Sequence, residues 1–162
     1  MAINLQNETF ESRDLLQLAE ASILRGDYQR ASLFLGEALK ISPDNPIYIS
    51  HLGLCTGMKG NITAAEDMCR KAIKLSPLEP IMFVNLGRVF LESGRRKEAR
   101  EAFMQAYEID NTNAPAALEL SRMGIRRRPA LPFLNRENSL NVYLGRLRCK
   151  ISELRGPKIK KL

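Results

Sequence analysis

The side chains that most often do chemistry are few in this chain of 162 residues. It has one histidine, His51, and three cysteines, Cys55, Cys69 and Cys149. No Cys-x-x-Cys spacing, glycine-rich phosphate loop or convincing pair of acidic residues accompanies them. A lone histidine with no partner base is more often a contact residue than a catalyst. We therefore expect a protein that is not an enzyme, needs no cofactor and holds no metal.

The three cysteines are odd in number and lack metal-site spacing, so disulfides are not expected either. Buried thiols in a reducing compartment fit this pattern best. The first residues carry no basic segment followed by an apolar run, which is what a signal peptide needs. No stretch approaches the roughly 18 apolar residues of a membrane span. We expect a cytoplasmic location.

Charge is distributed very unevenly along the chain, whose net charge is +7. Residues 1–125 hold 14 basic and 16 acidic side chains, whereas residues 126–162 hold 11 basic and 2 acidic ones. The C-terminal segment therefore carries the whole excess and is expected to have an electrostatic role of its own. The basic residues that we assign to this extension are Arg126, Arg127, Arg128, Arg146, Arg148, Lys150 and Arg155.

The chain repeats with a period of 34 residues. The matching sets are Leu18, Leu52, Leu86 and Leu120; Gly26, Gly60 and Gly94; Ala31, Ala65 and Ala99; Ala38, Ala72 and Ala106; Ile41, Leu75 and Ile109; and Ala19, Gly53 and Gly87. Small residues at fixed phases predict stacked helical hairpins that make close contacts. We place the three copies at residues 12–45, 46–79 and 80–113. The glycines are expected to end the first helix of each copy.

The second copy resembles the tetratricopeptide repeat family. The residues that carry the resemblance are Leu52 and Gly53 in its first helix, Ala65 and Ala72 in its second, and Pro77 at its end. The third copy departs by having Asn111 in place of the terminal proline. The resemblance covers residues 12–113 and implies an all-α fold, a right-handed superhelix of three helical hairpins.

The segments outside the three copies complete the expected architecture. Residues 1–11 are polar and are predicted to be a flexible lead-in. Residues 114–125 keep the phase of a first helix and are predicted to cap the stack, so that the repeat domain spans 12–125. The basic extension, 126–162, is predicted to form an amphipathic basic helix at about 139–154.

Family resemblance implies that the first helices line a concave groove that holds an extended peptide or a helix of another protein. The groove phases of the family correspond to Arg13, Leu16, Gln17, Glu20 and Leu24 in copy one, to Ile47, Ser50, His51, Leu54 and Met58 in copy two, and to Ile81, Val84, Asn85, Arg88 and Leu91 in copy three. These phases are rich in Leu, Ile, Val and Met, and exposed apolar patches usually mark a binding surface.

One subfamily clamps the C-terminal carboxylate of its partner with Lys and Asn at defined groove phases. The corresponding positions here hold Leu16, Glu20, His51, Ile81 and Asn85. Asn85 alone resembles a clamp residue, and Glu20 would repel a carboxylate at its own phase. We therefore do not expect binding of chaperone tails by that clamp.

Two occupants could fill an apolar groove. One is an apolar peptide or amphipathic helix of a protein partner of unknown identity. The other is residues 131–134 of this same chain together with its apolar stripe of residues 140–154. The alternative for the stripe is that it packs only on the capping helix. The predicted function is non-catalytic protein recognition, as an adaptor, scaffold or small chaperone. The alternative is attachment of the basic extension to nucleic acid or to an anionic membrane surface.

Overall fold

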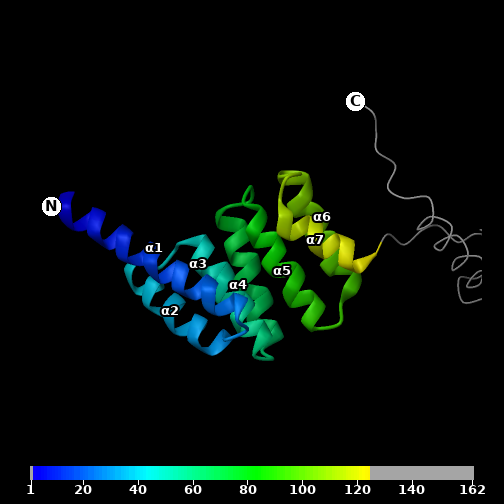
Figure 1. Ribbon diagram of the computed structural model, residues 1–162, viewed down its shortest axis with the longest axis horizontal. Coiled ribbons are helices and arrows are strands. Elements are labelled where there is room, and N and C mark those ends of the chain that lie inside the picture. The colour runs from blue at the N-terminus through cyan, green and yellow to red at the C-terminus, as the bar shows by residue number, and fades with distance from the viewer. Residues whose placement is uncertain (1, 125–162) are drawn as a thin grey trace, which may run out of the picture. The chain divides into compact units, whose positions relative to one another are not determined.

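The computed structural model describes residues 2–124, and these residues form helices and short turns without a strand (Figure 1). Seven helices follow one another in this part of the chain. They are α1 (Ala2–Leu24), α2 (Tyr28–Ile41), α3 (Pro46–Met58), α4 (Ile62–Leu75), α5 (Pro80–Glu92), α6 (Arg96–Ile109) and α7 (Ala114–Met123). Helices α1 to α6 pair into three hairpins, and α7 follows as a single helix. The predicted all-α fold of repeated hairpins is confirmed.

The turn inside each hairpin depends on a glycine with positive φ. Gly26, Gly60 and Gly94 have φ values of 78°, 96° and 75°, in the left-handed region that a side chain disfavours. In the first two turns an Asx residue then caps the next helix, because Asp27 accepts a hydrogen bond from the amide of Arg30 and Asn61 accepts one from the amide of Ala64. The predicted role of these glycines is confirmed.

Prolines and asparagines start the helices that follow each hairpin. Pro46 and Pro80 are the first residues of α3 and α5, where the missing N–H removes no helical hydrogen bond. The side chain of Asn45 accepts from the amides of Ile47 and Tyr48, and Asn113 caps α7 in the same way. Each hairpin therefore ends and the next begins at positions that the sequence itself specifies.

Two glycines of the repeat lie where helices approach most closely. A Cβ atom on Gly53 would lie 2.9 Å from the sulfur of Cys69, and one on Gly87 would lie 2.6 Å from a ring carbon of Phe103. Alanines complete the same contacts, since Ala31, Ala65 and Ala99 are fully buried. The small residues thus allow the second helix of each hairpin to pack directly on the first.

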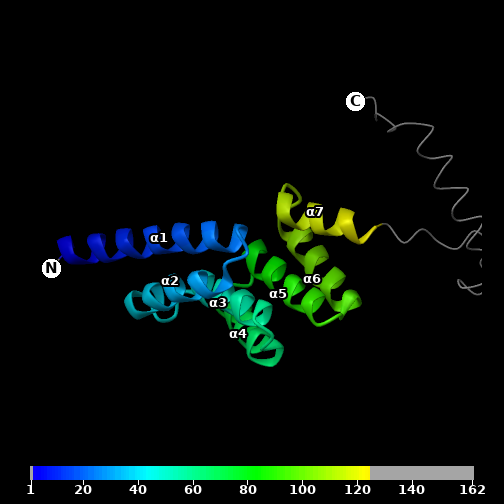
Figure 2. The same cartoon turned by 60° about the horizontal axis from the view of Figure 1, so that its bottom comes forward.

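The hairpins follow one another in sequence order from α1 to α7 (Figures 1 and 2). Helix α2 packs on α3, α3 and α4 pack on α5, and α6 packs on α7. The first hairpin therefore meets the second mainly through α2, while α1 stands further from α3 than α3 does from α5. This difference matters for the groove, because it leaves room beside the C-terminal end of α1.

Helix α1 is longer than the sequence predicted. We expected a flexible lead-in over residues 1–11, but α1 begins at Ala2. Glycine and proline are missing from residues 2–24, so no residue there interrupts a helix once it has started. At the other end, α7 spans Ala114–Met123, close to the predicted capping helix of 114–125.

The basic extension and its predicted helix at about 139–154 lie outside the described residues, as do Arg126, Arg127, Arg128, Arg146, Arg148, Lys150 and Arg155. Within residues 2–124, no helix is both long enough and apolar enough to cross a membrane.

Candidate functional site

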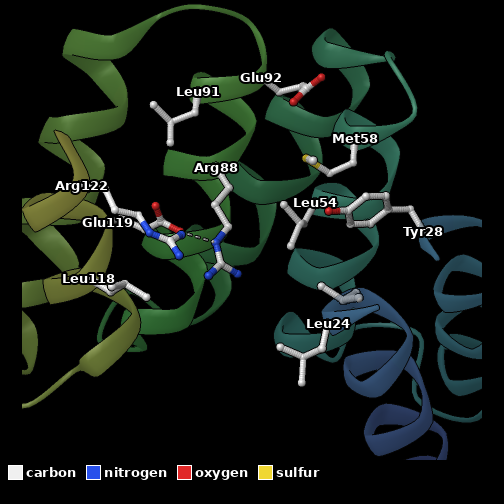
Figure 3. A pocket seen from close by; sticks show the side chains of 11 residues that line it. Leu24, Tyr28, Leu54, Met58, Arg88, Leu91, Glu92, Leu118, Glu119 and Arg122 are labelled. Carbon is white, nitrogen blue, oxygen red and sulfur yellow. Dashed lines mark hydrogen bonds and ion pairs between the residues drawn. The ribbon is translucent and has the colours of Figure 1, made fainter. Parts of the chain in front are cut away.

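An open pocket of about 600 Å³ lies beside the C-terminal ends of α1, α3 and α5 (Figure 3). Side chains from five helices line it, which none of the hairpins could provide alone. The lining residues are Ile23, Leu24, Tyr28, Leu54, Met58, Arg88, Leu91, Glu92, Leu118, Glu119 and Arg122.

One side of the pocket is apolar. Leu24, Tyr28, Leu54 and Met58 lie together on that side (Figure 3). Leu24 is the last residue of α1 and is 88% exposed, which is unusual for a leucine beside a cavity. Burying it against a ligand would remove a large apolar surface from water, worth about 1.5–3 kcal/mol for a whole leucine side chain.

The other side of the pocket carries charge. Glu119 of α7 accepts from Arg88 of α5, with an Nε–Oε1 distance of 3.4 Å, and its Oε1 lies 3.6 Å from Nη1 of Arg122. Glu92 adds an exposed carboxylate at the rim. The pocket therefore combines an apolar wall with a polar one, because α5 and α7 contribute charged side chains opposite the apolar residues.

Beneath the inner surface, polar residues connect neighbouring first helices. The amide nitrogen of Asn85 donates to the hydroxyl of Ser50 over 3.0 Å, and the amide oxygen of Asn85 has no partner among the described residues. Nδ1 of His51 lies 2.8 Å from the carbonyl of Ile47, and its Nε2 lies 3.6 Å from Glu20. This pattern makes Ser50, His51 and Asn85 parts of the packing between helices, not open contact residues.

Burial lowers the pKa of His51 below its usual value of 6.5, and the nearby positive charge of Arg88 acts in the same direction. The hydrogen bond with Ile47 and the carboxylate of Glu20 act in the opposite direction but do not outweigh burial. His51 is therefore neutral at neutral pH in the folded protein.

This buried histidine predicts a step in stability below neutral pH. The unfolded chain binds a proton at His51 near pH 6.5, and the folded protein binds it only at lower pH, so stability is lost as the pH falls below about 6.5. The loss is at most about 1.4 kcal/mol for each pH unit. Urea unfolding between about pH 5.5 and 7.5 should show this slope. The variant His51→Gln should have a flatter profile whatever its absolute stability, and an equal slope in both proteins would contradict the assignment.

The 15 predicted groove residues fall into three groups. Five line the pocket: Leu24, Leu54, Met58, Arg88 and Leu91. Four are buried between helices, namely Ser50, His51, Val84 and Asn85. The remaining six lie outside the pocket, where Arg13, Gln17 and Glu20 are exposed and Leu16, Ile47 and Ile81 are partly buried. These four side chains are at most 4% exposed and do not line the pocket.

Six lining residues were missed: Ile23, Tyr28, Glu92, Leu118, Glu119 and Arg122. Four of them repeat predicted phases one period later. Glu92 follows Met58 by 34 residues, and Leu118, Glu119 and Arg122 follow Val84, Asn85 and Arg88 by the same spacing. Continuing the groove phases of the second and third copies by one period would have found them. Tyr28 could not be found in this way, because it belongs to a second helix.

The described part of the chain offers little for catalysis or metal binding. Across residues 2–124, no group of three or more His, Cys, Asp and Glu side chains could hold a metal ion. Cys55 and Cys69 are buried and unpaired, and burial raises the pKa of the first to about 11 and of the second to about 12. Both remain thiols at neutral pH and are poor nucleophiles.

Comparison with known proteins places the repeats in a family. Residues 81–113 match the model described as "Tetratricopeptide repeat". The small glutamine-rich tetratricopeptide repeat-containing protein 2 of Mycosarcoma maydis is 31% identical over 87 residues, which is 54% of this chain and 25% of that protein. The chain thus spans about a quarter of the curated relative that it matches.

Two solved structures are similar to the described helices. A mutant O-GlcNAc transferase of Thermobaculum terrenum aligns with a TM-score of 0.62 and 28% identity, over 72% of this chain and 22% of that one. The first tetratricopeptide domain of Spaghetti (RPAP3), bound to an HSP90 peptide, aligns with a TM-score of 0.57 and 18% identity, over 70% of this chain and 92% of that one. At 18% identity the likeness shows the fold alone. With the repeat period, the glycine turns and these matches in agreement, the described helices have the tetratricopeptide repeat fold, and residues 81–113 match the model of that repeat.

Proposed function

We propose that this protein is a non-catalytic recognition module that binds an apolar peptide or an amphipathic helix of another protein. The observation that carries the proposal is the open pocket, where apolar side chains from separate helices face solvent together. Leu24, at 88% exposure, is the most exposed of the large apolar side chains that line the pocket. Exposed apolar surface of this kind is typical of binding sites that receive a helix or an extended segment.

Similar proteins support this class of function. The Spaghetti domain carries an HSP90 peptide on the same fold, so stacked hairpins of this type can hold a short segment of another chain. The present pocket lies towards the C-terminal ends of α1, α3 and α5, and its residues differ from the Lys and Asn pattern of the carboxylate clamp. We therefore infer protein binding but not the same peptide. An adaptor, scaffold or small chaperone acting in the cytoplasm would fit.

A single charge in the apolar wall should weaken binding strongly. Peptides selected on the full-length protein from a library of random linear peptides are expected to lose about tenfold or more in affinity for Leu24→Asp, because the buried contact becomes a desolvated carboxylate. The matched control is Leu33→Asp on α2, since Leu33 is 65% exposed and does not line the pocket. Fluorescence anisotropy measures both. Equal losses in the two variants would place the binding surface elsewhere.

The alternative function rests on the basic extension. Residues 126–162 carry 11 basic side chains against 2 acidic ones, a composition that favours nucleic acid or anionic lipid. Their placement lies outside the described residues, so the groove remains the better supported proposal. The idea that the stripe of residues 140–154 occupies the groove of the same chain remains a sequence-based prediction.

A further inference from the structure

The guanidinium group of Arg88 lines the pocket and uses only its Nε atom in a hydrogen bond within residues 2–124. Its Nε donates to Glu119, while the two terminal nitrogens point away from that carboxylate into the space between Leu118 and Leu24 (Figure 3). Among residues 2–124, no hydrogen bond is made by these two nitrogens. The side chain is 33% exposed, so a ligand can reach it. Two parallel N–H donors on a planar group match the geometry of a carboxylate.

The charge around Arg88 favours a single negative charge. Arg88 and Arg122 both lie beside the one carboxylate of Glu119, an excess of one positive charge in this corner, and Glu92 at the rim brings the pocket lining as a whole to neutrality. Glu119 is largely buried, with a side chain that is 10% exposed, and so it cannot move away easily. A ligand carboxylate would neutralise the extra positive charge of this corner without displacing Glu119.

We propose that the partner segment carries an acidic side chain beside a large apolar one, and that Arg88 binds its carboxylate. The apolar neighbour lies against Leu24, Tyr28 and Met58, across the pocket from the ion pair. This inference rests on the proposed function and specifies the chemistry of the segment that the groove accepts. Arg88 is then the residue that determines specificity, and the apolar wall supplies most of the contact area.

A phosphate group fits this corner less well than a carboxylate does. A phosphoserine carries close to two negative charges at neutral pH. Glu119 contacts Arg88 directly, and Glu92 lines the same pocket. The second charge of a phosphate would therefore meet acidic side chains without a free cation to balance it.

Parallel peptide selections test the proposal. A library of random linear peptides is panned on the full-length protein and on Arg88→Glu. Peptides from the first selection should share an Asp or Glu next to a large apolar residue, and peptides from the second should have Lys or Arg in that position. Arg88→Gln should bind the acidic peptides about 10- to 100-fold more weakly, because a charge-assisted bidentate contact is lost.

Three controls separate Arg88 from other effects. Arg96→Gln, an exposed site on α6, removes the same charge from a side chain that does not line the pocket and should leave the affinity unchanged. Arg88→Lys keeps the charge and the pairing with Glu119 but loses the planar pair of donors, so a several-fold loss is expected. Replacing the acidic residue of a selected peptide by phosphoserine should weaken binding.

The outcomes distinguish this inference from the function on which it rests. Peptides that depend on Leu24 but have no acidic position, or that bind Arg88→Gln as tightly as the unchanged protein, would overturn the inference and leave the proposed function standing. Tighter binding of the phosphoserine peptide would overturn the choice of a carboxylate. A selection that yields no peptide dependent on Leu24 would reject the proposed function and the inference together.

Discussion

Replacing Gly87 with alanine is expected to lower the free energy of unfolding by about 1–2 kcal/mol, although alanine is the better helix former. A Cβ atom at this position would lie 2.6, 2.8 and 2.9 Å from three ring carbons of Phe103. The ring is fully buried and cannot turn aside without disturbing its neighbours in the core. The overpacking therefore outweighs the gain of about 1 kcal/mol in helix propensity. Urea unfolding measures the difference.

Gly36 provides the matched control, because it also lies inside a helix but a Cβ atom added there would have no other atom within 4 Å. Gly36→Ala should stabilise the protein by about 1 kcal/mol, the opposite sign. A second test uses the first repeat, where the positions equivalent to Gly87 and Phe103 hold Ala19 and Leu35 in a common core cluster. The double variant Gly87→Ala with Phe103→Leu should recover part of the lost stability. If Gly87→Ala is as stable as Gly36→Ala, the close approach of α5 and α6 is wrong.

Phe103→Ala is expected to have the largest effect, a loss of about 3–5 kcal/mol in the free energy of unfolding. Phe103 is the largest of the fully buried side chains and belongs to the cluster that joins α3, α4, α5, α6 and α7. Its removal leaves a cavity beside Gly87, which has no side chain to fill it. The neighbouring change Met104→Ala should alter stability by less than about 0.5 kcal/mol, because Met104 is exposed. Similar losses in the two variants would contradict the placement of the ring.

The repeat was predictable because its determinants are local. A turn that needs positive φ selects glycine, as at Gly26, and a helix start that has no use for an N–H tolerates proline, as at Pro46. Both requirements return after 34 residues, so the sequence shows the glycine three times and the helix-start proline twice. The close contact at Gly87 was predictable for a similar reason. The repeated small residue is found in the sequence even though the ring that it faces is not.

The site was only partly predictable, because it depends on how successive hairpins turn relative to each other. Ser50 and Asn85 occupy groove phases of the family, yet they are buried where α3 packs on α5. Leu24 occupies the corresponding inner surface of α1 and is exposed, because α1 stands away from α3. The 34-residue spacing in the sequence gives no information about this difference in exposure. The start of α1 at Ala2 was missed for another reason, since its first residues lack the apolar periodicity on which the prediction depended.

The two walls of the pocket are held in place by different kinds of contact. Among the described residues, α7 buries two side chains, Ala116 and Glu119, and the second is held by arginines. Dissolved salt screens such a contact, whereas it leaves the leucine and tyrosine packing of the opposite wall unchanged. We therefore expect the contacts of the α7 wall to be more sensitive to ionic strength than those of the wall formed by α1, α2 and α3.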